Sequence, residues 1–158
     1  MKRLLSTALL AAGALAAFPS FSANSLVLHS ANTGNNYVAY YDMKTPLDAQ
    51  NFCLSKGGHL AVFNSHAEIL DVQKLLALDV SNNYWLGVYA LAGQPTYQSV
   101  TSQPFFQDPA FTFYIYPTPT SSDTYLKAIV TSSSPALYFS SEPSDIAHFV
   151  CEFEDAPL

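Results

Sequence analysis

The chain contains few residues whose type and spacing could carry out chemistry. Its only two cysteines, Cys53 and Cys151, could form one disulfide bond between distant parts of the sequence. Its histidines lack the paired spacing, on a helix face or beside cysteines, that zinc sites show. They are His29, His59, His66 and His148. We therefore predict no metal site.

The remaining nucleophiles and acids show no pattern of an enzyme. Serine is abundant, but no Gly-x-Ser-x-Gly sequence marks a nucleophile elbow. Carboxylates for glycoside hydrolysis would have to face each other across a cleft, whereas the acids here gather at expected turns and near the C-terminus. We predict that the protein is not an enzyme and uses no cofactor.

Residues 1–23 have the three-part pattern of a secretory signal peptide. Lys2 and Arg3 precede an apolar run over 4–18, and a proline and a Ser/Ala-rich tail follow. No later segment has the roughly eighteen unbroken apolar residues that a bilayer crossing needs. We expect a secreted, extracellular protein, or a periplasmic one if the source is a Gram-negative bacterium. Oxidising compartments make pairing of the two cysteines the default.

Residues 24–158 form one predicted domain with a strongly acidic charge. Their number suits a single hydrophobic core. They include four lysines and no arginine against twelve acidic residues, so the net charge is −8. A surface of this sign repels phosphate backbones and anionic lipid headgroups. We therefore predict neither nucleic-acid binding nor membrane insertion.

The first half of the domain has signals for a strand and two helices. Residues 36–41 favour a strand, and Thr45 followed by a proline marks the start of a helix of about eleven residues. This helix ends at Gly57-Gly58, because glycine tolerates the left-handed cap. Residues 60–63 favour a short strand or an extended link. A capping box over 65–68 starts a second helix of roughly a dozen residues.

The second half predicts strands around a long loop. Residues 84–89 favour a buried strand with the chain's only tryptophan, Trp85. Prolines and a glycine interrupt regular structure over 92–124, which predicts the loop. Further strands are expected at 125–130, 136–139 and 148–153. A strand, two helices and then several strands indicate an α+β domain.

The order of these features resembles the C-type lectin-like domain. The matching residues are a helix with Ala49 and Cys53, the sequence GGHLA at 57–61, the second helix opening, WLGV at 85–88 and VCE around Cys151. The resemblance covers nearly all of residues 24–158. It implies two helices packed on antiparallel sheets with a long loop region, and a Cys53–Cys151 disulfide from the first helix to the last strand. It also implies a core Trp85 and a ligand-binding surface on the loop.

The sequence departs from this family in its second disulfide and its calcium site. The missing cysteines would fall near Ala128 and Pro143. Sugar-binding members hold calcium through acid-proline motifs in the long loop and an Asn-Asp pair, where this chain has Phe139-Ser140. Phenylalanine supplies no oxygen ligand. The sequence EPSD at 142–145 lies too near Cys151 for the long loop, so we interpret it as a turn.

Aromatic residues of the long loop are the best candidates for ligand binding. Alternation over 111–116 sends Tyr114 and Tyr116 to the face opposite the phenylalanines. A tyrosine ring can stack on a sugar or anchor a protein, although these rings could instead close a small core of the loop itself. We predict a recognition module that binds carbohydrate without calcium. The alternatives are a protein-interaction or adhesion module that binds an extracellular protein, and a self-associating structural protein. The predicted ligand-binding residues are Tyr97, Phe106, Tyr114 and Tyr116.

Overall fold

A computed structural model describes residues 24–78, 82–94, 96–102, 122–131 and 134–154. The predicted signal peptide at 1–23 lies outside these ranges, as do Phe106, Tyr114 and Tyr116. Within the described ranges, no helix is long and apolar enough to cross a membrane.

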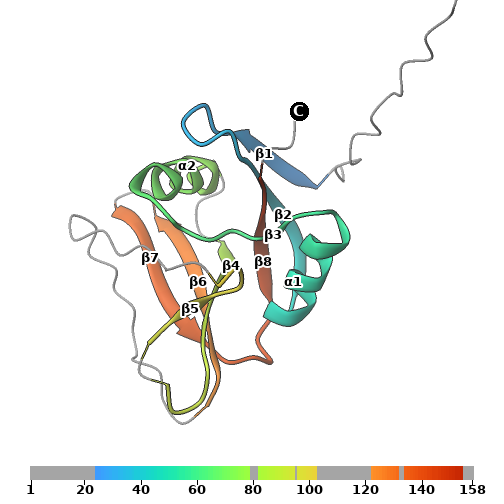
Figure 1. Ribbon diagram of the computed structural model, residues 1–158, viewed down its shortest axis with the longest axis vertical. Coiled ribbons are helices and arrows are strands. Elements are labelled where there is room, and N and C mark those ends of the chain that lie inside the picture. Colours follow the sequence, from blue (N-terminus) through green and yellow to red (C-terminus); the bar gives the residue numbers. More distant parts are fainter. Residues whose placement is uncertain (1–23, 79–81, 95, 103–121, 132–133, 155–158) are drawn as a thin grey trace, which may run out of the picture.

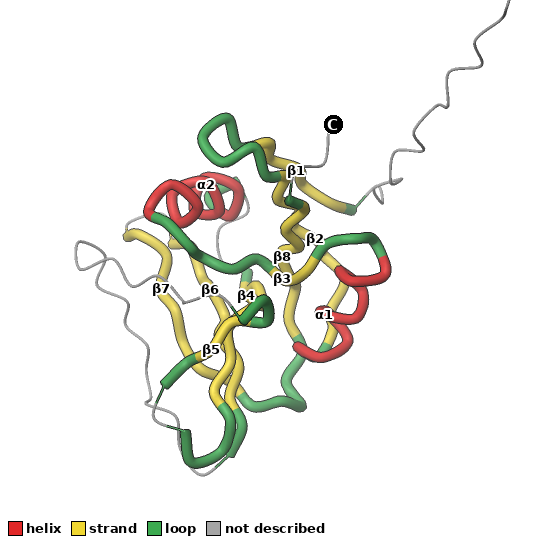
Figure 2. Tube along the Cα trace, in the orientation of Figure 1, coloured by secondary structure: helices red, strands yellow, loops and turns green. Residues whose placement is uncertain are grey.

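In the described residues, two helices pack against a mixed sheet, an α+β arrangement as predicted (Figure 1, Figure 2). The helices are α1 (Pro46–Ser55) and α2 (His66–Leu76). The described strands are β1 (Ser25–His29), β2 (Asn36–Lys44), β3 (His59–Leu60), β4 (Asn83–Ala90), β5 (Gln98–Ser99), β6 (Thr124–Thr131), β7 (Ser134–Ser141) and β8 (Ala147–Phe153). Their order in the sheet is β1-β2-β8-β4-β6-β7, with β3 paired to β8 and β5 to β4.

The last strand, β8, lies in the middle of this sheet. It runs antiparallel to β2, with Val38 opposite Cys151, and parallel to β4, with Trp85 opposite Phe149. The other strand pairs in the described part are antiparallel. The antiparallel arrangement that the family resemblance implies therefore has one exception, the β4–β8 pair.

Both helices begin where the sequence predicts. The Thr45 hydroxyl accepts a hydrogen bond from the Asp48 backbone N–H at 3.2 Å, and Pro46 takes the first helical position. In α2, Ser65 and Glu68 form a complete capping box in which each side chain accepts a hydrogen bond from the other's backbone N–H. The chain turns after α1 at Gly57, whose φ of 86° is unfavourable for other residues.

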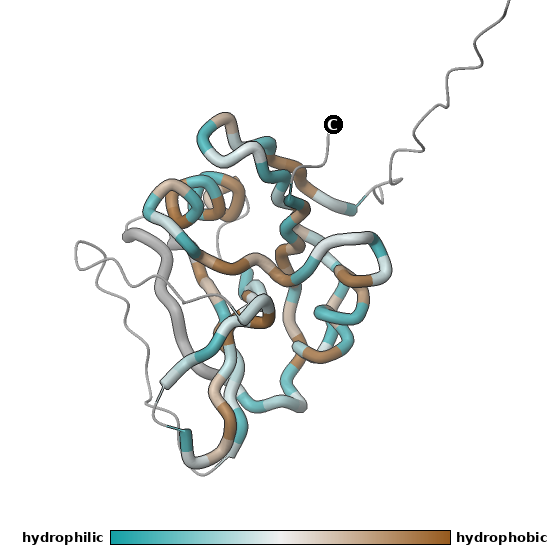
Figure 3. Tube along the Cα trace, in the orientation of Figure 1, coloured by the Kyte–Doolittle hydropathy of each residue, from teal (hydrophilic) through white to brown (hydrophobic). Residues whose placement is uncertain are grey.

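Several strands differ from the prediction. β1 has no predicted counterpart, because a five-residue edge strand is too short for its pattern to be identified. The segment 60–63, predicted as a short strand or an extended link, agrees with the prediction: it is a strand at Leu60 and continues as a buried link, coloured hydrophobic in Figure 3. Its backbone groups bond to β8, to β4 and to the Glu152 side chain instead of forming a regular ladder. The predicted loop at 92–124 contains the short strand β5.

The sheet buries one hydrophobic cluster on each face. Along β2, Tyr37 and Ala39 point into the cluster beneath α2, whereas Val38 and Tyr40 point into the cluster beneath α1. This alternation follows from the two-residue period of a strand. Trp85 is fully buried in the α1 cluster, as the resemblance implies, and its indole N–H donates to the Lys44 carbonyl oxygen at 2.7 Å.

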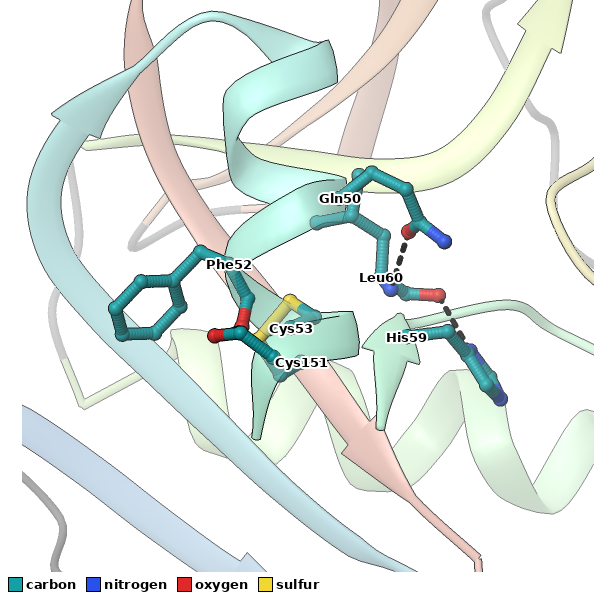
Figure 4. The surroundings of a disulfide bond; sticks show 7 residues. Gln50, Phe52, Cys53, His59, Leu60 and Cys151 are labelled. Atoms are coloured by element: carbon teal, nitrogen blue, oxygen red, sulfur yellow. Dashed lines mark hydrogen bonds between the residues drawn. A yellow bond between two sulfur atoms is a disulfide. The ribbon is translucent and has the colours of Figure 1, made fainter. Parts of the chain in front are cut away.

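A disulfide between Cys53 and Cys151 joins α1 to β8 (Figure 4). Both cysteines are fully buried, and their Cα atoms lie 5.5 Å apart. The predicted pairing is therefore present. It ties residues that are 98 positions apart in the sequence.

An ion pair links β6 to the turn before β8. Lys127 Nζ lies 3.1 Å from Asp145 Oδ2 and 4.4 Å from the centroid of the Trp85 ring. The Lys127 side chain is only 7% exposed. The family's second disulfide would fall near Ala128 and Pro143, so this ion pair connects the same two segments. The Asp145 N–H also donates to the Glu142 carbonyl oxygen, which forms the predicted turn at 142–145.

Candidate ligand-binding pocket

The long loop leaves and rejoins the sheet at neighbouring positions. Tyr89 of β4 lies opposite Tyr125 of β6, and Ala90 lies opposite Thr124. Beyond this pair, the Ala92 N–H donates to the Asp123 carboxylate at 2.8 Å. The strands and this hydrogen bond therefore fix both ends of the loop on one scaffold.

A pocket of about 170 Å³ lies beside these loop ends, between α1 and the sheet. Its wall consists of Pro46, Leu47 and Gln50 from the helix, Leu86, Tyr89 and Tyr125 from β4 and β6, and Leu60 and Val100. Leu60 and Leu86 are buried, whereas Leu47 is 62% exposed. The pocket therefore opens to solvent beside the first turn of α1.

Two tyrosines form the aromatic side of this pocket. The rings of Tyr89 and Tyr125 lie 6.1 Å apart, and the Tyr125 ring meets the Trp85 ring edge-on at 6.4 Å. Burial raises the pKa of Tyr125, and the nearby Asp123 raises it further. The Tyr125 hydroxyl thus stays protonated at neutral pH and is able to donate a hydrogen bond.

Gly87 brings the pocket walls together. A Cβ atom at this position would collide with the Leu60 carbonyl oxygen and would lie 2.8 Å from the Val100 side chain. The Gly87 N–H donates to the Ala61 carbonyl oxygen at 2.8 Å, and the Gly87 carbonyl oxygen accepts from the Val100 N–H at 2.9 Å. Because Gly87 has no side chain, β4 can approach the link that follows β3 (residues 61–63) on one side and Val100 on the other.

Gln50 is the polar group with a fixed orientation in the wall. Its side-chain oxygen accepts a hydrogen bond from the Leu60 N–H at 2.9 Å. This bond decides which end of the amide is the oxygen, because an amide nitrogen would place two donors face to face. Figure 4 shows the Gln50 amide nitrogen directed away from Leu60. The amide nitrogen of this wall residue is thus left as an N–H donor whose orientation the Leu60 bond fixes.

Only one predicted ligand-binding residue lies in the described part of the chain. Tyr97 is half-buried and packs against the core cluster beneath α2. Its hydroxyl oxygen is buried and has no hydrogen-bond partner among the described residues. Phe106, Tyr114 and Tyr116 lie outside the described residues, so their roles remain predictions. Leu47, Gln50, Tyr89 and Tyr125 were not predicted as site residues, because they meet only through the packing of α1 on the sheet.

Three buried acids lie away from this pocket and have structural partners. Glu152 accepts hydrogen bonds from the Val62 N–H at 3.0 Å and from the Asn35 side chain at 2.7 Å. Glu68 belongs to the capping box of α2. Asp71 accepts a hydrogen bond from the Ser30 hydroxyl and forms an ion pair with Lys74. Burial is the main cause that raises the pKa of Glu152 and of Glu68. In the part of the chain that the structure covers, no group of three or more His, Cys, Asp or Glu side chains could hold a metal ion.

Solved structures with the same arrangement of helices and strands identify the fold of this chain. Human lithostathine is 19% identical, covers 92% of this chain and 99% of its own, and gives a TM-score of 0.64. The carbohydrate-recognition domain of a mouse scavenger receptor C-type lectin is 18% identical, with 86% and 98% covered and a TM-score of 0.60. This chain has the C-type lectin-like fold.

A calcium-independent type II antifreeze protein also shares the C-type lectin-like fold. It is 16% identical, covers 85% of this chain and 95% of its own, and gives a TM-score of 0.60. No protein-family model and no curated protein sequence matches this chain. The resemblance in the sequence is therefore confirmed at the level of the fold.

Proposed function

We propose that this protein is an exported recognition module that binds carbohydrate through its long-loop surface without calcium. The observation that carries the proposal is the fixed root of the loop, where Tyr89 pairs with Tyr125 and the Asp123 carboxylate, at the returning end, accepts a hydrogen bond from the Ala92 N–H, at the departing end. Binding loops are commonly variable segments held by a rigid scaffold of this kind. The loop itself is rich in aromatic residues that can stack on sugar rings.

Two observations support binding without calcium. The position of the family's Asn-Asp pair holds Phe139-Ser140, which removes carboxylate and amide oxygens from the ligand set. In the turn at 142–145, Asp145 already pairs with Lys127. Its charge is thus partly neutralised within the fold.

A glycan array with the mature protein tests this function. We expect selective binding that persists when a chelator is present and falls at least about tenfold in Tyr114→Ala and Tyr116→Ala, because each loses a stacking ring. Tyr114→Phe and Tyr116→Phe are the matched controls, since they keep the ring and remove only the hydroxyl.

The outcomes of the array separate the functions. Binding that disappears with chelator contradicts the calcium-independent proposal. A folded protein without selective signal on any glycan contradicts carbohydrate binding and favours the alternative, an extracellular protein ligand.

A further inference from the structure

The pocket between α1 and the sheet has the size and lining of a site for a small ring. We propose that it binds one neutral six-membered ring that carries a hydrogen-bond acceptor. This site lies at the root of the long loop, and the proposal does not depend on carbohydrate binding by the loop itself. The ligand class is a small aromatic or alicyclic ketone, ether or ester.

The volume sets the size of the ligand. An apolar protein cavity of about 150 Å³ is large enough to bind one benzene molecule. The pocket here measures about 170 Å³, which leaves room for one ring with a small substituent.

The lining sets the polarity of the ligand. The wall consists of aliphatic and aromatic side chains with Gln50 as the amide, and none of the described residues that line it is charged. A charged ligand would lose its hydration without a compensating partner, which is costly. The apolar lining therefore selects a neutral ring.

Gln50 sets the orientation of the ligand. Its oxygen is occupied by the Leu60 N–H, so its amide nitrogen is the end left for a ligand. A carbonyl or ether oxygen on the ring would accept this hydrogen bond while the ring contacts Tyr89 and Tyr125.

The pocket walls are held in place without a ligand. Pro46 is buried at the first position of α1, and the Leu60 and Val100 backbones are hydrogen-bonded to Gln50 and Gly87. A preformed site loses little conformational entropy on binding. Even a ligand with nine non-hydrogen atoms can therefore bind with measurable affinity.

An NMR titration of the ¹⁵N-labelled mature protein tests the site with two probes of equal shape. Acetophenone carries the acceptor, and α-methylstyrene replaces its carbonyl by a hydrocarbon group. We expect both to shift the backbone amide signals of Leu60 and Val100 with dissociation constants in the millimolar range or tighter. Acetophenone should bind about fivefold more tightly, because one additional hydrogen bond contributes about 1 kcal/mol.

Substitutions in the wall separate the contributions. Val100→Phe fills the pocket and should weaken both probes at least about tenfold. Gln50→Glu keeps an oxygen for the Leu60 N–H but removes the donor, so it should remove the preference for acetophenone. Leu47→Trp covers the mouth from an exposed position and should weaken both probes even if Val100→Phe does not fold. Leu54→Phe, on an exposed part of α1 outside the pocket, is the matched control.

Absence of amide shifts with the wild-type protein would overturn the proposal, as would undiminished binding in folded Val100→Phe or Leu47→Trp. Equal affinities for the two probes would overturn the role of Gln50. Because the glycan array reports on the long loop, its failure would leave these titrations unaffected.

Discussion

At the scale of single residues, Glu152 shows how the fold uses a buried acid. Glu152 lies in β8 and is fully buried. Its side chain accepts hydrogen bonds from the Val62 N–H, in the link that follows β3, and from the Asn35 side chain, in the loop before β2. Burial raises its pKa, the facing Glu68 raises it further, and His59 and the hydrogen bonds lower it. Folding thus favours the protonated carboxyl.

Stability should consequently depend on the protonation of Glu152. Its contribution is complete below the ordinary glutamate pKa of about 4.3 and is lost as the pH rises through the raised pKa. We expect Glu152→Gln to make the decline of the unfolding free energy with rising pH less steep, as measured by urea denaturation at several pH values. Glu142→Gln, at an exposed turn, is the control and should leave the slope unchanged. Equal slopes for wild type and Glu152→Gln would refute this role.

Residues that act through local sequence could be predicted, whereas residues that act through tertiary contacts could not. Thr45 and Ser65 cap their helices as expected, because a cap depends on residues three positions away. Gln50 and Tyr125 meet at the pocket only because α1 packs beside β6. No spacing in the sequence indicates that meeting.

At the scale of elements, β6 and the turn before β8 are joined by a charged contact instead of a covalent one. The exposed fractions of the two partners differ, at 7% for the Lys127 side chain and 47% for that of Asp145. Lys127 therefore gives up most of its hydration and depends on Asp145 and the Trp85 ring to compensate.

Removal of this contact should destabilise the fold. We expect Lys127→Met to lower the free energy of unfolding by about 1 to 3 kcal/mol, because both the ion pair and the cation–π contact are lost. Lys56→Met is the control, since Lys56 is an exposed cation 5.8 Å from the Phe52 ring and should change stability by less than about 0.5 kcal/mol. Similar effects of the two substitutions in urea denaturation would show that burial of the pair is unimportant.

The elements themselves were predictable to different degrees. α1, α2, β4 and β8 have strong local signals, and their positions agree with the sequence to within a few residues. β1 and β5 are short strands that are recognised mainly by their hydrogen-bonded pairing, β1 with β2 and β5 with β4. Such pairing depends on distant residues, so no local pattern reveals it.

At the scale of the whole molecule, the Cys53–Cys151 bond encloses most of the domain in one covalent loop. We expect the double substitution Cys53→Ala/Cys151→Ala to lower the free energy of unfolding by about 4 to 5 kcal/mol, because closing a loop of 98 residues restricts the unfolded chain. Urea denaturation of the oxidised wild type and the double variant measures this difference. A loss below about 1 kcal/mol would mean that the bond adds little to the hydrophobic core.

The central position of β8 also determines when the chain can fold. During synthesis, β1 and β2 emerge early, and β4, β6 and β7 later, but the gap between these two groups stays open until residues 147–153 leave the ribosome. Both groups meanwhile present unpaired edges to other chains. The polypeptide must therefore be kept from premature association until this last strand is available to join the two groups.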